Sequence, residues 1–229
     1  MTPDKRFIQL PKSFWALVRL IGQECGYAAG GQITVASKAE VQAALAKLKL
    51  DPKSLDTALP DGRPVWKTLV AYFTHRRDTL HGQVEPNLMD SKQAKIEFTK
   101  LKRQLKPTCP LPMNKQKGMK KAPAYLTGMV NMLVEANAGE HQCDYDPRAL
   151  ATIATNGLPL RTFARRMDGA FPSVINPIAV WEVKEYYYTT TFGSRVADGV
   201  YETLLDGMEI EELLLTEKMN VLHYLIIDA

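Results

Sequence analysis

The sequence predicts an α/β protein, with a mixed β-sheet flanked by helices in the C-terminal half and a mainly helical region before it. Two observations favour this class. Apolar residues recur at helical spacing through the first 106 residues, whereas short runs of β-branched and aromatic residues, separated by turn residues, dominate from about residue 149. A chain of 229 residues, 45% of them hydrophobic, can also bury a core without disulfides or a structural metal.

Three helices are expected in the N-terminal region. Residues 13–28 have apolar positions at helical spacing, with Ser13 as the N-cap. A second helix begins after Ser37, and Glu40 follows three residues later in the capping-box position. The third covers residues 65–80. Short helices in this arrangement permit a helix-turn-helix, but the pattern alone is weak evidence for one.

Basic charge is concentrated in residues 92–121, which hold ten Lys or Arg and one Glu. A net charge of +9 favours a polyanionic partner, because each Lys or Arg placed on a phosphate releases a counterion. Residues 92–106 are expected to form a helix with an apolar stripe of Ile96, Leu101 and Leu105, and residues 107–121 a basic linker. A solvated basic helix without a ligand remains the alternative. The residues of this segment expected to contact DNA are Lys95, Lys102, Arg103, Lys106, Lys115, Lys117 and Lys120.

The order of elements after residue 122 is predicted to be helix, three strands, helix and strand. Turn residues and the change of periodicity separate these elements. The helices are expected at 124–139 and, capped by Ser194, at 195–215; the strands are expected at 149–155, 159–167, 177–192 and 220–228.

A carboxylate and an ammonium group are expected side by side on the strand 177–192. Glu182 and Lys184 are two residues apart, so both point to one face, and Trp181 and Val183 point to the other. Such a pair can hold a divalent cation and stabilise developing negative charge. Asp168, at the end of the preceding strand, would join Glu182 if the strands pair antiparallel. A hairpin turn at Asp168-Gly169 is the structural alternative.

These residues and the order of elements resemble the PD-(D/E)XK nuclease superfamily over residues 122–229. The superfamily includes type II restriction endonucleases and repair nucleases. The resemblance implies a restriction-endonuclease-like fold in which Asp168, Glu182 and the backbone carbonyl of Val183 bind Mg²⁺, or Mn²⁺ in its place. It also implies that Lys184 helps to activate the attacking water. Glu135 is the best-placed match to an additional acidic residue that many members carry on the first core helix, whereas Met167 stands where the family has a proline before the aspartate.

The implied activity is Mg²⁺-dependent cleavage of double-stranded DNA by a type II restriction endonuclease. A homodimer is expected, because cutting two strands requires two active sites. A structure-specific repair or recombination nuclease and a non-catalytic DNA-binding protein remain as alternatives. Further DNA contacts are expected from Arg165, Arg166, Ser194 and Arg195.

Two other features bear on the environment of the protein. Three scattered cysteines, and no apolar run near the roughly 18 residues of a membrane span, indicate an intracellular, cytoplasmic protein without a membrane partner. Asp198, Glu202, Asp206 and Glu209 are expected to form a solvated acidic face on the helix after the Glu182 strand.

Overall fold

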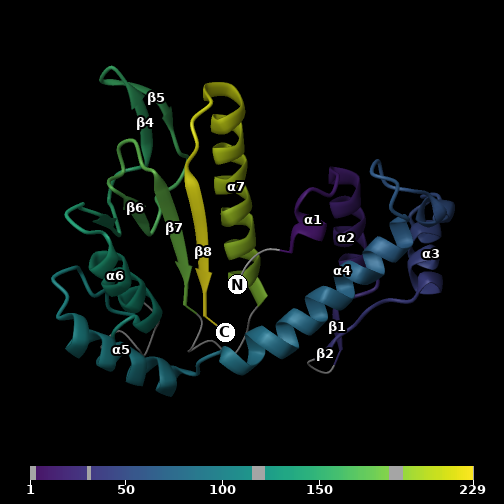
Figure 1. The fold of residues 1–229 in the computed structure, drawn as a ribbon, viewed down its shortest axis with the longest axis horizontal. Helices are drawn as coiled ribbons and strands as arrows, with labels where there is room; N and C mark the ends of the chain where they lie inside the picture. The colour runs from purple at the N-terminus through teal and green to yellow at the C-terminus, as the bar shows by residue number, and fades with distance from the viewer. Residues whose placement is uncertain (1–3, 30–31, 115–121, 186–192, 229) are drawn as a thin grey trace. The chain divides into compact units, whose positions relative to one another are not determined.

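The computed structural model describes residues 4–29, 32–114, 122–185 and 193–228 (Figure 1). The chain divides into two compact units, Met1–Asn87 and Leu88–Ala229. This division lies before the expected boundary at residue 106, so the basic helix belongs to the C-terminal unit. The reason is packing, because Ala94 and Phe98 of that helix are buried in a cluster with Tyr125 and Met129.

The N-terminal unit is helical, as predicted. Its core contains Phe14, Ile21, Leu45 and Leu69, each at most 2% exposed. The Ser37–Glu40 capping box is confirmed, but the first long helix begins at Lys12 after Pro11, so Ser13 does not cap it. The elements are α1 (Lys5–Ile8), α2 (Lys12–Glu24), β1 (Ala28–Ala29), β2 (Gln32–Ile33), α3 (Lys38–Lys47), η1 (Pro52–Asp56), α4 (Val65–Thr79), η2 (Leu80–Val84) and η3 (Glu85–Asn87).

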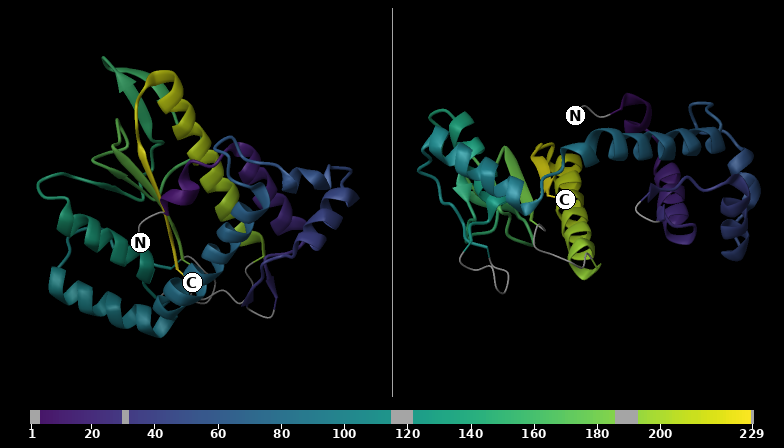
Figure 2. Two further views of the ribbon diagram at one scale, coloured as in Figure 1. Left: turned by 45° about the vertical axis from the view of Figure 1, so that its right-hand side comes forward. Right: turned by 90° about the horizontal axis from the view of Figure 1, so that it is seen from below.

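A four-stranded mixed sheet forms the centre of the C-terminal unit (Figures 1 and 2). The strands lie in the order β3-β6-β7-β8; β6 is antiparallel to β3 and β7, and β8 is parallel to β7. Helix α6 precedes the sheet and α7 connects the two parallel strands, so both helices and the last strand follow in the predicted order. Between α6 and α7, however, the described chain forms five strands and not the predicted three. The elements are α5 (Ser91–Leu105), α6 (Tyr125–Asn137), β3 (Asp144–Tyr145), β6 (Gly169–Phe171), β7 (Ala179–Lys184), α7 (Gly193–Glu217) and β8 (Leu222–Ile227).

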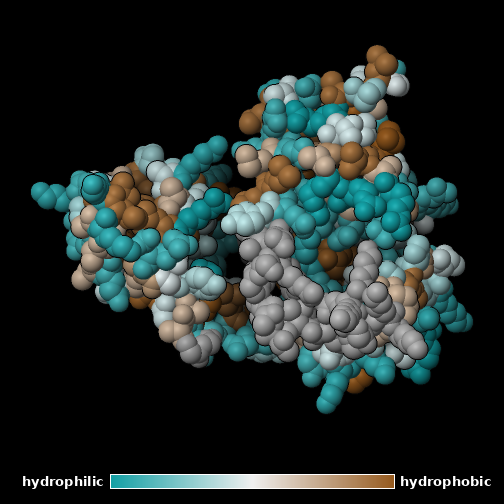
Figure 3. Space-filling view, turned by 180° about the vertical axis from the view of Figure 1, so that it is seen from behind, coloured by the Kyte–Doolittle hydropathy of each residue, from teal (hydrophilic) through white to brown (hydrophobic). Residues whose placement is uncertain are grey.

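Two of the three strands predicted before α7 were assigned to the wrong sheet. Residues 149–155 and 159–167 contain β4 (Thr152–Thr155) and β5 (Leu158–Thr162), which pair with each other in a separate two-stranded sheet; an isolated bridge also joins Thr152 to Ile175. Asn156 and Gly157 both adopt positive φ, as a tight hairpin turn requires. Figure 3 shows apolar atoms at the tip of this hairpin, upper right, in agreement with the exposure of Leu158 and Leu160. The strand that pairs with β7 on the side away from β8 is β6, which follows Asp168 rather than preceding it.

Helices α6 and α7 cover opposite faces of the sheet (Figure 1). Val180 of β7 is buried with Ile210 and Leu213 of α7, whereas Trp181 faces the α6 side, where it lines a groove with Val134. Successive side chains of a strand point to opposite faces, so this alternation fixes the direction of every later residue of β7.

Helix α5 packs on α6 and confirms the predicted basic helix, although its buried stripe differs. Ala94 and Phe98 are buried, whereas Ile96 is 57% and Leu105 37% exposed. A Cβ on Gly128 of α6 would lie 2.6 Å from the Phe98 ring, so the close approach of the two helices requires glycine there. All three cysteines are free, and within the described residues no helix is long and apolar enough to cross a membrane.

Candidate active site

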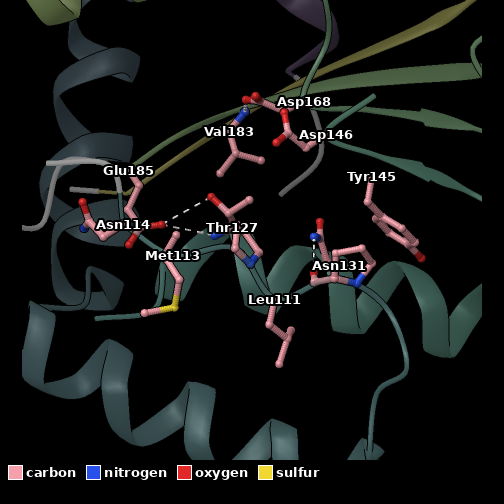
Figure 4. Close-up of a pocket in the computed structure, with 13 residues that line it drawn as sticks. Leu111, Met113, Asn114, Thr127, Asn131, Tyr145, Asp146, Asp168, Val183 and Glu185 are labelled. Atoms are coloured by element: carbon pink, nitrogen blue, oxygen red, sulfur yellow. Dashed lines mark hydrogen bonds between the residues drawn. The ribbon is translucent and has the colours of Figure 1, made fainter. Parts of the chain in front are cut away.

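A pocket of about 410 Å³ lies beside Asp168, on the α6 side of the sheet (Figure 4). The segment 110–114, the first half of α6, the end of β3 and the residues around Asp168 and β7 all contribute to it. Its polar or charged lining residues are Asn114, Thr127, Asn131, Tyr145, Asp146, Asp168 and Glu185, and its apolar ones are Pro110, Leu111, Pro112, Met113, Ala124 and Val183.

Asp168 lies where β6 begins, next to β7. Its Oδ2 accepts a hydrogen bond from the Val183 N–H at 2.8 Å, and its own N–H donates to the Trp181 carbonyl at 3.0 Å. The Lys184 carbonyl accepts a hydrogen bond from the N–H of Asp228, directly after β8, so the backbone groups of Val183 point the other way, toward Asp168. The Val183 carbonyl therefore lies on the same side of the strand as the Asp168 carboxylate. Asp168-Gly169 is not a hairpin turn, because Gly169 is the first residue of β6.

Glu182 and Lys184 share one face of β7, as predicted, but that face looks toward α7. Glu182 is 1% exposed and lies 2.8 Å from Arg165 Nη1 and 3.2 Å from Lys184 Nζ. Lys184 also pairs with Glu202, and Arg165 lies 2.7 Å from Asp206. Figure 4 and the pocket lining instead place Val183 and Glu185 with Asp168. The structure thus brings Glu182 and Lys184 together and directs Asp168 into the pocket on the other side.

The charges of this network shift the pKa values of its members. Burial lowers the pKa of Lys184, but hydrogen bonds and charge from Glu202 and Glu182 outweigh it, so the net pKa is raised. Burial raises the pKa of the Asp206 carboxyl despite its pairing with Arg165. For Glu202, burial is outweighed by the hydrogen bond from Lys184, and the pKa falls. Lys184 is therefore a charged group held by two carboxylates.

The acidic face predicted for α7 is not solvated throughout. Asp206 is fully buried against Arg165, and Glu209 accepts the backbone N–H of Ala164 at 3.2 Å. The predicted acidic residues whose side chains the structure describes do share one face of α7, as their helical spacing indicated. That face packs against the segment after β5 that contains Ala164 and Arg165. The side chain of Asp198 is outside the described part of the chain.

Glu185 has a structural contact that the sequence did not indicate. Its carboxylate accepts the backbone N–H groups of Tyr125 at 2.8 Å and Thr127 at 3.3 Å, at the N-terminus of α6. Since Ala124, the N-cap residue, offers no side-chain cap, Glu185, the residue directly after β7, supplies it. Burial raises the pKa of Glu185, and the two backbone hydrogen bonds oppose this rise.

Glu135 does not line the pocket. Its carboxylate accepts the N–H of Thr108 at 3.0 Å and also bonds the Thr108 hydroxyl, and these bonds lower its pKa. Glu135 lies near the C-terminal end of α6, whereas the pocket takes its α6 residues from the first half of the helix. Its observed role is to hold the segment that connects α5 and α6.

The predicted DNA contacts fall into three groups. Lys95, Lys102, Arg103 and Lys106 are exposed on α5 or at its C-cap, and Arg166 is exposed as well. Arg165 is instead committed to Glu182, Glu202 and Asp206. Lys115, Lys117 and Lys120 lie outside the described residues, as do the side chains of Ser194 and Arg195.

Most of the pocket residues were missed by sequence reasoning, among them Asp146 and Asn131. Asp146 directly follows β3 and donates its N–H to the Asp168 carbonyl at 2.9 Å. Asn131 is 3% exposed on α6; its Nδ2 donates to the Pro110 carbonyl, and its Oδ1 has no hydrogen-bond partner. The two-residue strand β3 has no detectable periodicity, so only the acidic run Asp144-Tyr145-Asp146 could have drawn attention to it.

The predicted magnesium ligands fit a cation only in part. The Asp168 carboxylate and the Val183 carbonyl are hard oxygen donors on one side of β7. Glu182 does not fit, because it is buried on the other face and is paired with Arg165 and Lys184. Within the described ranges, no three His, Cys, Asp or Glu side chains are grouped closely enough to hold a metal by themselves.

Two family models match the chain, one within each unit. Residues 89–229 match a family described as a domain of unknown function, DUF7687, and residues 1–83 match a second, DUF7690. The first match covers more than half of the chain, so the protein belongs to the DUF7687 family. The two matched ranges agree with the division of the structure after Asn87. No curated protein and no solved structure matches the chain.

Proposed function

We propose that this protein is a Mg²⁺-dependent DNA endonuclease, of the type II restriction class, that hydrolyses phosphodiester bonds in duplex DNA. The observation that carries the proposal is the position of Asp168. Its carboxylate lies against the Val183 N–H, at the centre of a mixed sheet built in the order helix, three strands, helix and strand. The resemblance to PD-(D/E)XK nucleases implies this order of elements around the sheet, although it was expected to put Asp168 at the end of a strand and not directly before β6.

Asp168 and the Val183 carbonyl would hold the cation, and the N–H of Val183 fixes the orientation of the Asp168 carboxylate. A bound Mg²⁺ would supply Lewis acidity to the scissile phosphate and lower the pKa of a bound water. Lys184 can act on this chemistry only after it leaves Glu202. In the observed arrangement, Glu182, Lys184 and Arg165 hold β7 against α7, so the proposal gives them a positioning role.

The α5 surface supplies the expected contact with the DNA backbone. Six basic residues of this helix and its C-cap are exposed, while Ala94 and Phe98 fix the opposite side to α6. A phosphate backbone lying on this side would gain affinity from counterion release, and binding would weaken steeply with salt. The six residues are Lys92, Lys95, Lys100, Lys102, Arg103 and Lys106.

Plasmid digestion with and without Mg²⁺ tests the proposal, using the wild type, Asp168→Asn and Lys184→Met. Asp78→Asn, which removes an exposed carboxylate of α4, is the matched control. Discrete fragments that require Mg²⁺ and Asp168, and that persist in the control, support a restriction endonuclease. Smearing or nicking that requires Asp168 favours the structure-specific nuclease instead.

A non-catalytic DNA-binding protein is the second candidate. It is favoured because Glu182 and Lys184 form ion pairs on the α7 side of β7 and do not line the pocket with Asp168. It predicts salt-sensitive DNA binding that is equal in the wild type and Asp168→Asn, with no Mg²⁺-dependent cleavage of duplex, flap or single-stranded substrates. That result overturns the nuclease proposal.

A further inference from the structure

Asp146 and Asp168 are neighbours across two antiparallel strands. Tyr145 of β3 pairs with Gly169 of β6, so the next position of the register sets Asp146 opposite Asp168. The Asp146 N–H donates to the Asp168 carbonyl at 2.9 Å, which holds the two backbones together at this point. Both side chains line the same pocket, and Figure 4 shows them side by side.

Two ionised carboxylates in this position repel each other, and a divalent cation bound between them would remove that repulsion. Like charges at directly opposite positions of a sheet are destabilising. Of the thirteen described residues that line the pocket, three are acidic and none is Lys, Arg or His. The third acid, Glu185, accepts hydrogen bonds from the N-terminus of α6.

Asn131 provides a separate indication of a ligand. Its side chain is almost fully buried, and the bond from Nδ2 to the Pro110 carbonyl fixes the orientation of the amide. The other end of the amide, Oδ1, has no hydrogen-bond partner, although a buried polar atom normally has one. In Figure 4 this oxygen points toward the side of the pocket where Asp146 and Asp168 lie.

We propose that Asp146 and Asp168 form a two-carboxylate site for a hard divalent cation of the Mg²⁺ or Mn²⁺ type, facing the amide oxygen of Asn131. Mg²⁺ is commonly held by one or two carboxylates and keeps several waters, so a third acidic side chain is not required. The described lining residues include no cysteine or histidine, the usual ligands of structural zinc sites. In the proposed nuclease, on which this part of the inference rests, Asp146 takes the place expected of Glu182.

Titration of the full-length protein with Mn²⁺ by isothermal calorimetry tests the site without reference to activity. We expect the wild type to bind Mn²⁺, and Asp146→Asn and Asp168→Asn to bind it with at least about a tenfold lower affinity. Even the mutation of a residue that only hydrogen-bonds to a metal ligand lowers metal affinity by about that factor. Glu182→Gln, the control on the other face of β7, should keep its affinity. Circular dichroism checks that each variant is folded.

Three results separate this inference from the proposed function. Absence of Mn²⁺ binding, or loss of binding in Glu182→Gln with full binding in folded Asp146→Asn, overturns the cation site. Cleavage that needs Asp168 and Glu182 but not Asp146 overturns the site and retains the nuclease. Binding that needs both aspartates, without any DNA cleavage, supports the site and overturns the nuclease.

Discussion

Gly169, the residue after Asp168, is predicted to be intolerant of any side chain. A Cβ at this position would lie 2.0 Å from Cζ2 and 2.1 Å from Cε2 of Trp181, whereas ordinary contacts begin near 3.4 Å. The indole ring would have to retreat by about 1.4 Å, and it is only 4% exposed. Gly169 does not adopt a positive φ, so the penalty of Gly169→Ala is steric rather than conformational.

We expect Gly169→Ala to lower the free energy of unfolding by about 3 kcal/mol, the upper part of the range for overpacked cores. For a unit of this size, that corresponds to a fall of roughly 6–12 °C in the melting temperature, measured by scanning calorimetry. Gly207→Ala is the matched control, because nothing lies within 4 Å of its Cβ and it is inside α7. This control should gain up to about 1 kcal/mol from helix propensity.

A double-mutant cycle isolates the steric cause. In a Trp181→Leu background the ring is absent, so adding Gly169→Ala should cost less than about 1 kcal/mol. If Gly169→Ala costs the same with and without the indole ring, or no more than Gly207→Ala, the packing argument for this position is refuted.

Three further predictions concern stability. Phe98→Ala should cost about 3–5 kcal/mol in urea unfolding because the ring fills the α5–α6 contact, whereas Ile96→Ala, on the exposed side of α5, should stay within about 0.5 kcal/mol; equal effects would contradict this packing. Because folding raises the pKa of Glu185, the contribution of this group to the free energy of unfolding is complete at pH values below the ordinary carboxyl pKa. That contribution is lost as the pH rises through the raised pKa of the folded protein. Glu185→Gln should therefore gain stability relative to the wild type between pH 4 and pH 7, and a constant difference in urea midpoints would argue against burial as the cause. Ser37→Ala should cost about 1 kcal/mol through loss of the capping box, and an unchanged urea midpoint would refute that contribution.

Much of the fold could be predicted, because helices and the capping box depend on local patterns. Helices α2, α3, α4, α5, α6 and α7 and the last strand were all anticipated within a few residues, whereas the short helices α1, η1, η2 and η3 were not. Strand pairing was harder. The segments with the clearest β pattern, β4 and β5, form a local hairpin, whereas β3 and β6 are two and three residues long and have too few positions to show alternation.

The sequence by itself determined that Glu182 and Lys184 share one face of β7 and that Val183 takes the other, because a strand alternates its side chains. Only the tertiary structure decided which helix each face meets. It turned Glu182 and Lys184 toward Arg165 and the acidic side of α7, and it turned Asp168 toward Asp146 and Asn131. In the same network, Arg165 and Asp206 are 41 positions apart, and a local periodicity carries no information about such partners.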